Sequence, residues 1–123
     1  MTSEIKIALD CMGGDDAPTM VVRGADLAVE RQPDLFFHLV GNEKEIIPLI
    51  KASRYLHNNN HKITHTHKKV AAADKPSVAL RGGRDTSMRL AIDLVSGGSA
   101  HGVVSAGNTG ALMAMSKLSL RMC

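Results

Sequence analysis

Aromatic residues are almost missing from this sequence of 123 residues, which has no tryptophan, one tyrosine and two phenylalanines. A hydrophobic core must therefore be built mainly from Leu, Ile, Val, Ala and Met. The scarcity also argues against nucleic acid as a partner, because proteins that bind single strands set aromatic side chains among basic ones. We therefore expect no nucleic-acid binding.

Long apolar runs and paired cysteines are missing as well. No run approaches the roughly 18 apolar residues of a membrane-spanning helix, and Glu4 interrupts any signal-peptide pattern. Cys11 and Cys123 lie at opposite ends of the chain without metal-ligand spacing, as expected of free thiols in a reducing compartment. We expect a cytoplasmic protein with a single domain over residues 1–123.

Charged residues are present but unevenly distributed, although the formal net charge is only +3. Residues 1–50 hold four Lys or Arg against nine Asp or Glu, whereas residues 51–89 hold nine against two. The basic segment favours an acidic partner or an anionic substrate, and the alternative is a solvated surface. Within it, "DKPSVALRGGRDTSMR" (residues 74–89) could clamp a phosphate or dock an acidic protein. The candidates are Lys75, Arg81, Arg84 and Arg89.

Apolar runs typical of strands alternate with segments of helical periodicity. Strands are predicted at residues 5–9, 35–40, 62–70 and 102–105, and helices at 18–31, 43–53, 77–81, 86–97 and from Asn108 onward. Such alternation is typical of βαβ units and predicts an α/β fold with an open parallel sheet. The apolar run at 35–40 predicts a strand covered on both faces, whereas the polar run at 62–70 predicts an edge strand.

Short polar residues mark the expected helix ends. N-terminal caps are predicted at Asp16 or Ala17, at Asn42, and at Asp85 or Thr86. The glycine pair at residues 97–98 is expected to end the helix at 86–97. The last helix, at residues 111–120, is apolar on most sides, so we expect a truncated chain or a surface covered by another subunit.

Two glycine-rich turns follow predicted strands, at residues 12–15 and 106–110. The carboxyl ends of parallel strands lie at one edge of a sheet, where ligands bind, so both turns are expected to face one cleft. In "VVSAGNTGALMA" (residues 103–114) the strand runs into a helix N-terminus, whose free backbone amides attract anions. Gly107 and Gly110 would let a ligand approach, and Asn108 and Thr109 would add side-chain contacts. The alternative is an ordinary capped turn.

Three polar side chains beside these turns are further candidates. Ser105 lies where a hydrolase nucleophile would lie, but Val103 replaces the first glycine of G-x-S-x-G and no histidine or acid is obviously placed to activate it. We expect its hydroxyl to hydrogen-bond a ligand or the backbone. Asp10 and Asp15 flank Gly13 and Gly14, one of which is expected to have a positive φ. This turn either is purely structural or orients a polar ligand, and nothing else favours a metal.

Histidines at residues 57, 61, 65 and 67 suggest a metal site at first sight. Metal sites usually add cysteine or carboxylate ligands at a fixed spacing, and the sequence has neither here. We interpret these residues as solvated histidines and expect no metal.

Three segments together resemble the bacterial acyl-[acyl-carrier-protein]:phosphate acyltransferases of phospholipid synthesis. They are "IALDCMGGDDAP", "LVGN" and "DKPSVALRGGRDTSMRLAIDLVSGGSAHGVVSAGNTGALMA". The likeness is collinear, specific in MGGD and SAGNTGALM, and weak over residues 53–73. Cys11 and the Gly82-Gly83 pair depart from the family pattern. Members of that family are more than twice as long, so the chain resembles an N-terminal portion.

This resemblance implies a homodimeric enzyme with a fold related to phosphate acetyltransferases and isopropylmalate-type dehydrogenases. It would move a long acyl chain from the acyl-carrier-protein thioester to inorganic phosphate without a cofactor, giving an acyl phosphate. A membrane-bound glycerol-3-phosphate acyltransferase would use that product, which implies peripheral association with the inner face of the membrane. Alternatives are an acyl-CoA donor, or an inactive fragment that acts only as an interaction module.

Phosphate is already a charged nucleophile, so such an enzyme must mainly hold it beside the thioester and stabilise the oxyanion. For catalysis the candidates are Asp10, Asp15, Ser105 and Asn108. For binding phosphate or the acyl donor they are Gly13, Gly14, Lys75, Arg81, Arg84, Arg89, Gly107, Thr109 and Gly110.

Overall fold

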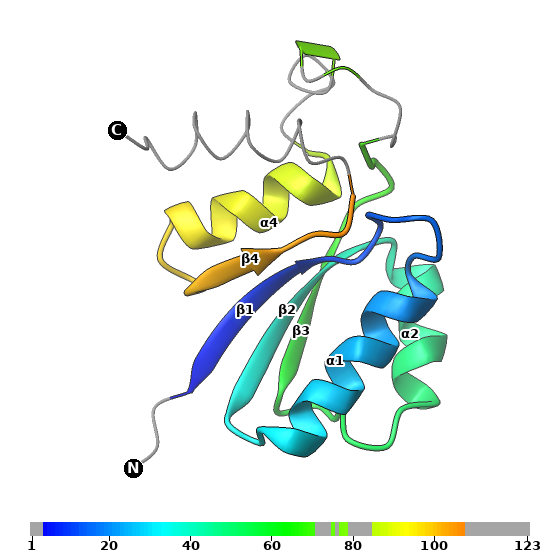
Figure 1. Cartoon of the computed structure of the whole chain (residues 1–123), viewed down its shortest axis with the longest axis vertical. Helices are drawn as coiled ribbons and strands as arrows, with labels where there is room; N and C mark the ends of the chain where they lie inside the picture. Colours follow the sequence, from blue (N-terminus) through cyan, green and yellow to red (C-terminus); the bar gives the residue numbers. More distant parts are fainter. Residues whose placement is uncertain (1–3, 71–74, 76, 79–84, 108–123) are drawn as a thin grey trace.

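A computed structural model describes residues 4–70, 75, 77–78 and 85–107, which form a parallel sheet between helices (Figure 1). The elements are β1 (Ile5–Asp10), α1 (Thr19–Arg31), β2 (Leu35–Gly41), α2 (Glu43–Lys51), β3 (His61–His65), α4 (Ser87–Ser96) and β4 (Gly102–Val104). All strand pairs are parallel and the strand order is β3-β2-β1-β4. The predicted α/β fold with an open parallel sheet is therefore confirmed, and β3 lies at an edge as its polar sequence indicated.

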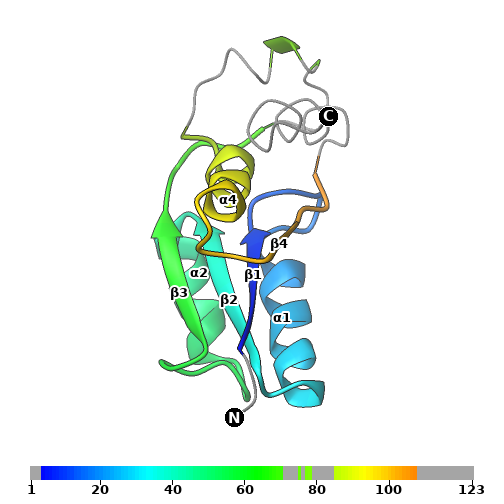
Figure 2. The same cartoon turned by 90° about the vertical axis from the view of Figure 1, so that its left-hand side faces the viewer.

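Helices cover both faces of the sheet. α1 and α2 lie on one face and α4 lies on the other (Figures 1 and 2). On the first face, Phe37 and Leu39 of β2 pack in a core with Val22 and Ala25 of α1. On the second face, Val40 packs with alanines of β1 and α4. β2 is thus covered on both faces, as predicted from its apolar run.

Helix ends largely follow the predicted caps. The Asn42 side chain accepts a hydrogen bond from the Lys44 amide, and the Thr86 side chain accepts one from the Arg89 amide. α4 ends at Gly97, and the following Gly98 has a φ of 85°. At α1 the prediction was wrong by one or two residues, because Pro18 occupies the N-cap position and makes no side-chain cap hydrogen bond.

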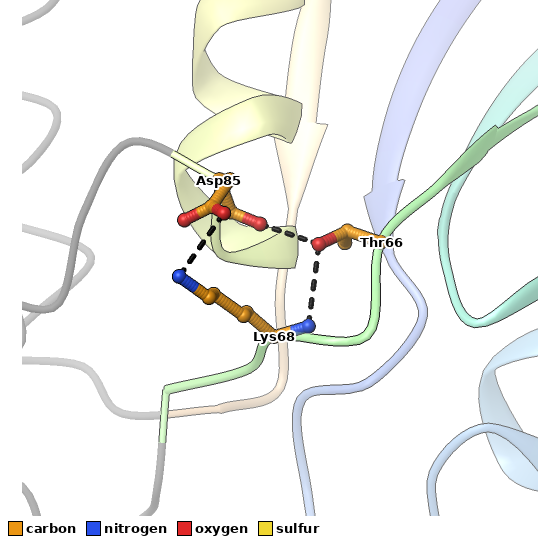
Figure 3. Close-up of polar contacts among 3 residues, drawn as sticks. All are labelled: Thr66, Lys68 and Asp85. Atoms are coloured by element: carbon orange, nitrogen blue, oxygen red, sulfur yellow. Dashed lines mark hydrogen bonds and ion pairs between the residues drawn. The ribbon is translucent and has the colours of Figure 1, made fainter.

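The strand predicted at residues 62–70 ends earlier, at His65. The Thr66 hydroxyl donates to the Asp85 carbonyl oxygen at 2.5 Å, and the Lys68 amide donates to the Thr66 oxygen at 3.2 Å (Figure 3). Lys68 and Asp85 also form an ion pair at 3.2 Å. After β3 the chain therefore pairs with the residues that begin α4 instead of continuing in the sheet.

Some predictions fall outside the described residues. Among them are most of the short helix at 77–81, the helix from Asn108 onward, and the apolar surface at 111–120. Within the part of the chain that the structure describes, no helix is long and apolar enough to cross a membrane.

Candidate functional site

The pairing of β1 with β4 determines which polar residues meet at the carboxyl edge of the sheet. Leu9 lies opposite Val104 in the parallel register, so Asp10 and Ser105 follow at neighbouring positions. Side chains alternate between the two faces of a strand. Leu9 and Val104 line the face that carries α1, whereas Asp10 and Ser105 interact with each other and, through Asp10, with α4.

Asp10 is the centre of a buried hydrogen-bond network and is only 2% exposed. Its Oδ1 accepts hydrogen bonds from the Ser87 hydroxyl at 2.5 Å and from the Met12 amide at 3.1 Å. Its Oδ2 accepts one from the Ser105 hydroxyl at 2.9 Å. A buried carboxylate needs such donors, because burial without them carries a large desolvation penalty.

Ser105 links this buried network to the surface. It is half-buried, and its Oγ accepts a hydrogen bond from the Gly107 amide at 3.1 Å while its proton is donated to Asp10. The expected bond to the backbone is confirmed. The sequence showed no acid obviously placed to activate Ser105, but Asp10 reaches it from the neighbouring strand across 95 residues of sequence.

The two glycine-rich turns lie against each other, and they can do so because Gly13 and Gly107 have no side chain. A Cβ on Gly13 would lie 2.8 Å from Asp10 Oδ2, 2.9 Å from Ser105 Oγ and 3.0 Å from the Gly107 nitrogen. A Cβ on Gly107 would lie 3.2 Å from the Gly13 Cα. The positive φ predicted for this region occurs at Gly14, at +99°. A side chain at Gly13 would therefore collide with Asp10 and Ser105, and one at Gly107 would be crowded against Gly13.

The Gly107 amide was expected to help bind an anion. In the structure this amide is used by Ser105 Oγ, so it is already paired.

The remaining candidates lie around this centre or outside the described residues. Asp15 and Gly14 are exposed on the first turn, and Lys75 is exposed. Arg89 of α4 is half-buried and its Nε pairs with Asp93 Oδ1 at 3.2 Å. The candidates outside the described residues are Arg81, Arg84, Asn108, Thr109 and Gly110.

Ser87 was not predicted to be a site residue. Ser87 is fully buried on α4, and the buried positions of that helix also include Met88, Ala91 and Ile92. A serine on an otherwise apolar helix face needs a hydrogen-bond partner once it is buried. This pattern was the available signal, and the partner is Asp10.

Cys11 lies next to Asp10 but is not a candidate nucleophile. Burial, and then the negative charge of Asp10, raise the pKa of its thiol from the ordinary 9.0 to about 12. The thiolate is the reactive form of cysteine, so this side chain stays an inert thiol near neutral pH.

No metal centre is found among the described residues, which hold no group of three or more His, Cys, Asp or Glu suited to an ion. His65 and His67 do lie edge to face, with their Nε2 atoms 3.2 Å apart. The Nδ1 atom of His65, however, accepts a hydrogen bond from the Glu43 amide at the start of α2. His65 is thus a cap for that helix.

An apolar groove of about 370 Å³ lies on the other face of the sheet, between α1 and β4. Met20 and Val104 are more than half exposed there. The groove is lined by Leu9, Asp10, Met20, Val21, Gly24, Ala25, Ala28, Phe37, Val104 and Ala106. It reaches the carboxyl edge of the sheet but lies on the opposite face from Ser87.

Comparison with known proteins shows the family. The family model described as "Fatty acid synthesis protein" matches residues 5–123. The chain belongs to this family. Among the relatives in the family, a phosphate acyltransferase of Rhodospirillum centenum is 54% identical across 98% of this chain and 34% of its own length. A phosphate acyltransferase of Parvibaculum lavamentivorans is 53% identical across 99% of this chain and 34% of its own length. A phosphate acyltransferase from a Wolbachia of Brugia malayi is 47% identical across 98% of this chain and 36% of its own length.

The chain thus spans about a third of the length of the curated relatives it matches. Both of its most specific motifs, MGGD and SAGNTGALM, begin within the described carboxyl edge of the sheet.

Proposed function

We propose that the protein carrying this sequence is a phosphate acyltransferase that moves a long fatty acyl chain from acyl-[acyl-carrier-protein] to inorganic phosphate. The observation that carries the proposal is the similarity of this sequence to phosphate acyltransferases over almost its whole length, with 54% identical residues in one case. The family description, fatty acid synthesis protein, supports a role in lipid synthesis. The product would be an acyl phosphate for phospholipid synthesis.

In this reaction a phosphate oxygen attacks the thioester carbonyl carbon, the C–S bond breaks, and the thiol leaves with a proton. Phosphate itself is the nucleophile, so the enzyme needs no acylated side chain. The main task of the protein is then to hold two substrates in contact, which lowers the entropic part of the barrier. Ser105 supports this proposal as a half-buried polar group at the carboxyl edge of the sheet, where the two glycine-rich turns meet.

Charge supports the assignment of the acyl donor. Residues 51–89 hold nine basic and two acidic residues, and several of the lysines are exposed. An acidic carrier protein is attracted by such a surface, mainly through its rate of association. Exposed lysines in this segment are Lys51, Lys62, Lys68, Lys69 and Lys75. We further propose a homodimer that associates peripherally with the membrane-bound glycerol-3-phosphate acyltransferase.

The test is an assay of the whole purified protein with hexadecanoyl-carrier protein and phosphate. We expect thiol release that depends on phosphate, with hexadecanoyl phosphate found by mass spectrometry. Thiol release at equal efficiency from the CoA thioester would contradict the assignment of the donor. Carrier binding without phosphate-dependent release would contradict the enzymatic proposal and favour an interaction module. Asn108→Ala and Thr109→Ala are expected to raise the KM for phosphate more than that for the acyl donor.

A further inference from the structure

The hydrogen bonds of Ser105 determine what its hydroxyl can offer a ligand. A serine hydroxyl has one proton to donate and two lone pairs that accept. The proton is donated to Asp10 Oδ2, and one lone pair accepts the Gly107 amide. One lone pair remains, so Ser105 can only accept a hydrogen bond from a ligand.

This arrangement is fixed by the groups behind it. Asp10 is 2% exposed, and both of its oxygens act as acceptors. If the Ser105 proton turned toward the ligand, Asp10 Oδ2 would lose the only described donor it has and remain buried. Leaving a buried acceptor unpaired is unfavourable. Ser87, fully buried, keeps Asp10 in place by donating to Oδ1.

We propose that the Asp10–Ser105 pair makes this site selective for an oxyanion that carries a hydrogen, such as hydrogen phosphate, over one that carries none, such as sulfate. The proposal rests on the proposed function, because it specifies the anion of the same site. The P–OH group of hydrogen phosphate donates to the free lone pair of Ser105. Sulfate presents only acceptors, so one of its oxygens would face a lone pair without a proton between them.

The same hydrogen bond orients the nucleophile. It holds the protonated oxygen of phosphate at Ser105 and leaves the unprotonated oxygens free to attack the thioester. Ser87 acts here as a positioning residue, since it contacts Asp10 and not the ligand.

The test measures how sulfate inhibits phosphate-dependent thiol release by the whole protein. Arsenate is the matched analogue, since it resembles phosphate in shape and keeps a hydrogen at neutral pH. We expect arsenate to replace phosphate, and sulfate to bind at least about tenfold more weakly than phosphate, because a site built for one hydrogen bond rejects the analogue that lacks it. Sulfate that competes as well as arsenate would overturn the proposal.

Asp10→Asn gives the sharpest variant, because the Met12 amide fixes its orientation. The carbonyl oxygen of the new side chain must face that amide, so its NH2 group faces Ser105. Ser105 then accepts from the NH2 group and from Gly107, and its own proton is free to point at the ligand. We expect sulfate inhibition to strengthen by about tenfold relative to phosphate binding.

Ser105→Ala and Ser87→Ala complete the set. Ser105→Ala should remove the preference for phosphate, and Ser87→Ala should reduce it, since Asp10 loses its shortest hydrogen bond. Two variants serve as matched controls. Asp34→Asn lies at the opposite end of the sheet, and Ser53→Ala removes a hydroxyl that donates to the Leu49 carbonyl oxygen. Both should keep the wild-type affinity for sulfate relative to phosphate.

Each outcome separates the two proposals. Thiol release that does not depend on phosphate contradicts the proposed function. Suppose instead that thiol release depends on phosphate, but that folded Asp10→Asn and Ser105→Ala bind sulfate and phosphate with the same relative affinity as the wild type. That result contradicts the proposed selectivity and leaves the proposed function intact. Circular dichroism establishes folding, and if Asp10→Asn does not fold, the ratio in Ser105→Ala decides.

Discussion

Buried titratable side chains give the clearest predictions at the scale of single residues. Cys11 is fully buried, and its thiol pKa is raised to about 12, mainly by burial. In the unfolded chain the thiol ionises at its ordinary pKa of 9.0. Between these two values the folded state holds one more proton than the unfolded state. The folded state is therefore favoured less as the pH rises.

We expect Cys11 to resist iodoacetamide at pH 8 in the native protein and to react once denaturant is added. Relative to Cys11→Ala, the free energy of unfolding should fall by about 1.4 kcal/mol per pH unit between pH 9 and 12. Mass spectrometry measures the labelling, and denaturant titrations measure the slope. Rapid labelling of Cys11 in the native state would contradict the prediction.

His38 has the opposite pH dependence. Burial lowers its pKa below the ordinary 6.5, and its Nε2 lies 3.0 Å from the Ser99 carbonyl oxygen. A carbonyl only accepts, so Nε2 carries the proton and Nδ1 is the unprotonated nitrogen. Nδ1 has no hydrogen-bond partner among the described residues. The folded state therefore resists the second proton that the unfolded state takes up as the pH falls through 6.5.

Stability should consequently decrease as the pH falls from 7 to 5.5, and His38→Gln should flatten this part of the profile. Urea titrations at several pH values measure the effect. His57→Gln is the control, because His57 is exposed, and it should retain the wild-type profile. An identical slope in His38→Gln and the wild type would rule out His38 as the cause.

At the scale of elements, two glycines show how backbone conformation changes the effect of adding one methyl group. A Cβ added at Gly24, inside α1, would meet nothing within 4 Å, and the same is true at Gly98 after α4. Gly24 has a helical conformation, whereas Gly98 has a φ of +85°. The available space is thus equal and only the backbone differs.

We expect Gly24→Ala to stabilise the fold by about 0.4–1 kcal/mol, because alanine reduces the freedom of the unfolded chain. Gly98→Ala should destabilise it by about 1–2 kcal/mol, because a left-handed backbone disfavours a Cβ. Thermal unfolding of the two variants provides the comparison. Equal shifts of the same sign would show that packing outweighs the backbone conformation.

At the scale of the whole molecule, one carboxylate ties α1 to the connection between α2 and β3. Asp26 accepts hydrogen bonds from three successive amides, those of Arg54 at 3.2 Å, Tyr55 at 2.7 Å and Leu56 at 2.9 Å. Leu56 is buried in the core with Val22 and Val29 of α1. Asp26 therefore fixes the position of this connection against α1.

Asp26→Ala should lower the free energy of unfolding by about 2–3 kcal/mol, as expected for charge-assisted hydrogen bonds that are lost together. Glu30→Ala, on an exposed position of the same helix, should change it by less than about 0.5 kcal/mol. Chemical denaturation measures both, and amide exchange at residues 54–56 should accelerate only in Asp26→Ala. Unchanged exchange at these amides would contradict the role given to Asp26.

Local sequence patterns were sufficient for the parallel sheet, because strand and helix periodicity and caps such as Asn42 and Thr86 are properties of short segments. They also indicated the edge position of β3 and a positive φ at one of two glycines. They missed the early end of β3, because Thr66 bonds to a carbonyl 19 residues further along the chain. They missed the contact between Asp10 and Ser105 for the same reason, since strand order is decided by tertiary packing.

The strand order has a consequence for how the protein is made. β1 can pair with β2, and β2 with β3, as soon as the first half of the chain exists, but β4 is the last described strand and joins β1 on its other side. Asp10 must therefore wait for a partner 95 residues away. At ordinary rates of synthesis this delay is roughly 5–20 s, far longer than the time in which helices and hairpins form. During that interval the edge of β1 has no β4 to pair with, and an open sheet edge is a place where another chain can add a strand.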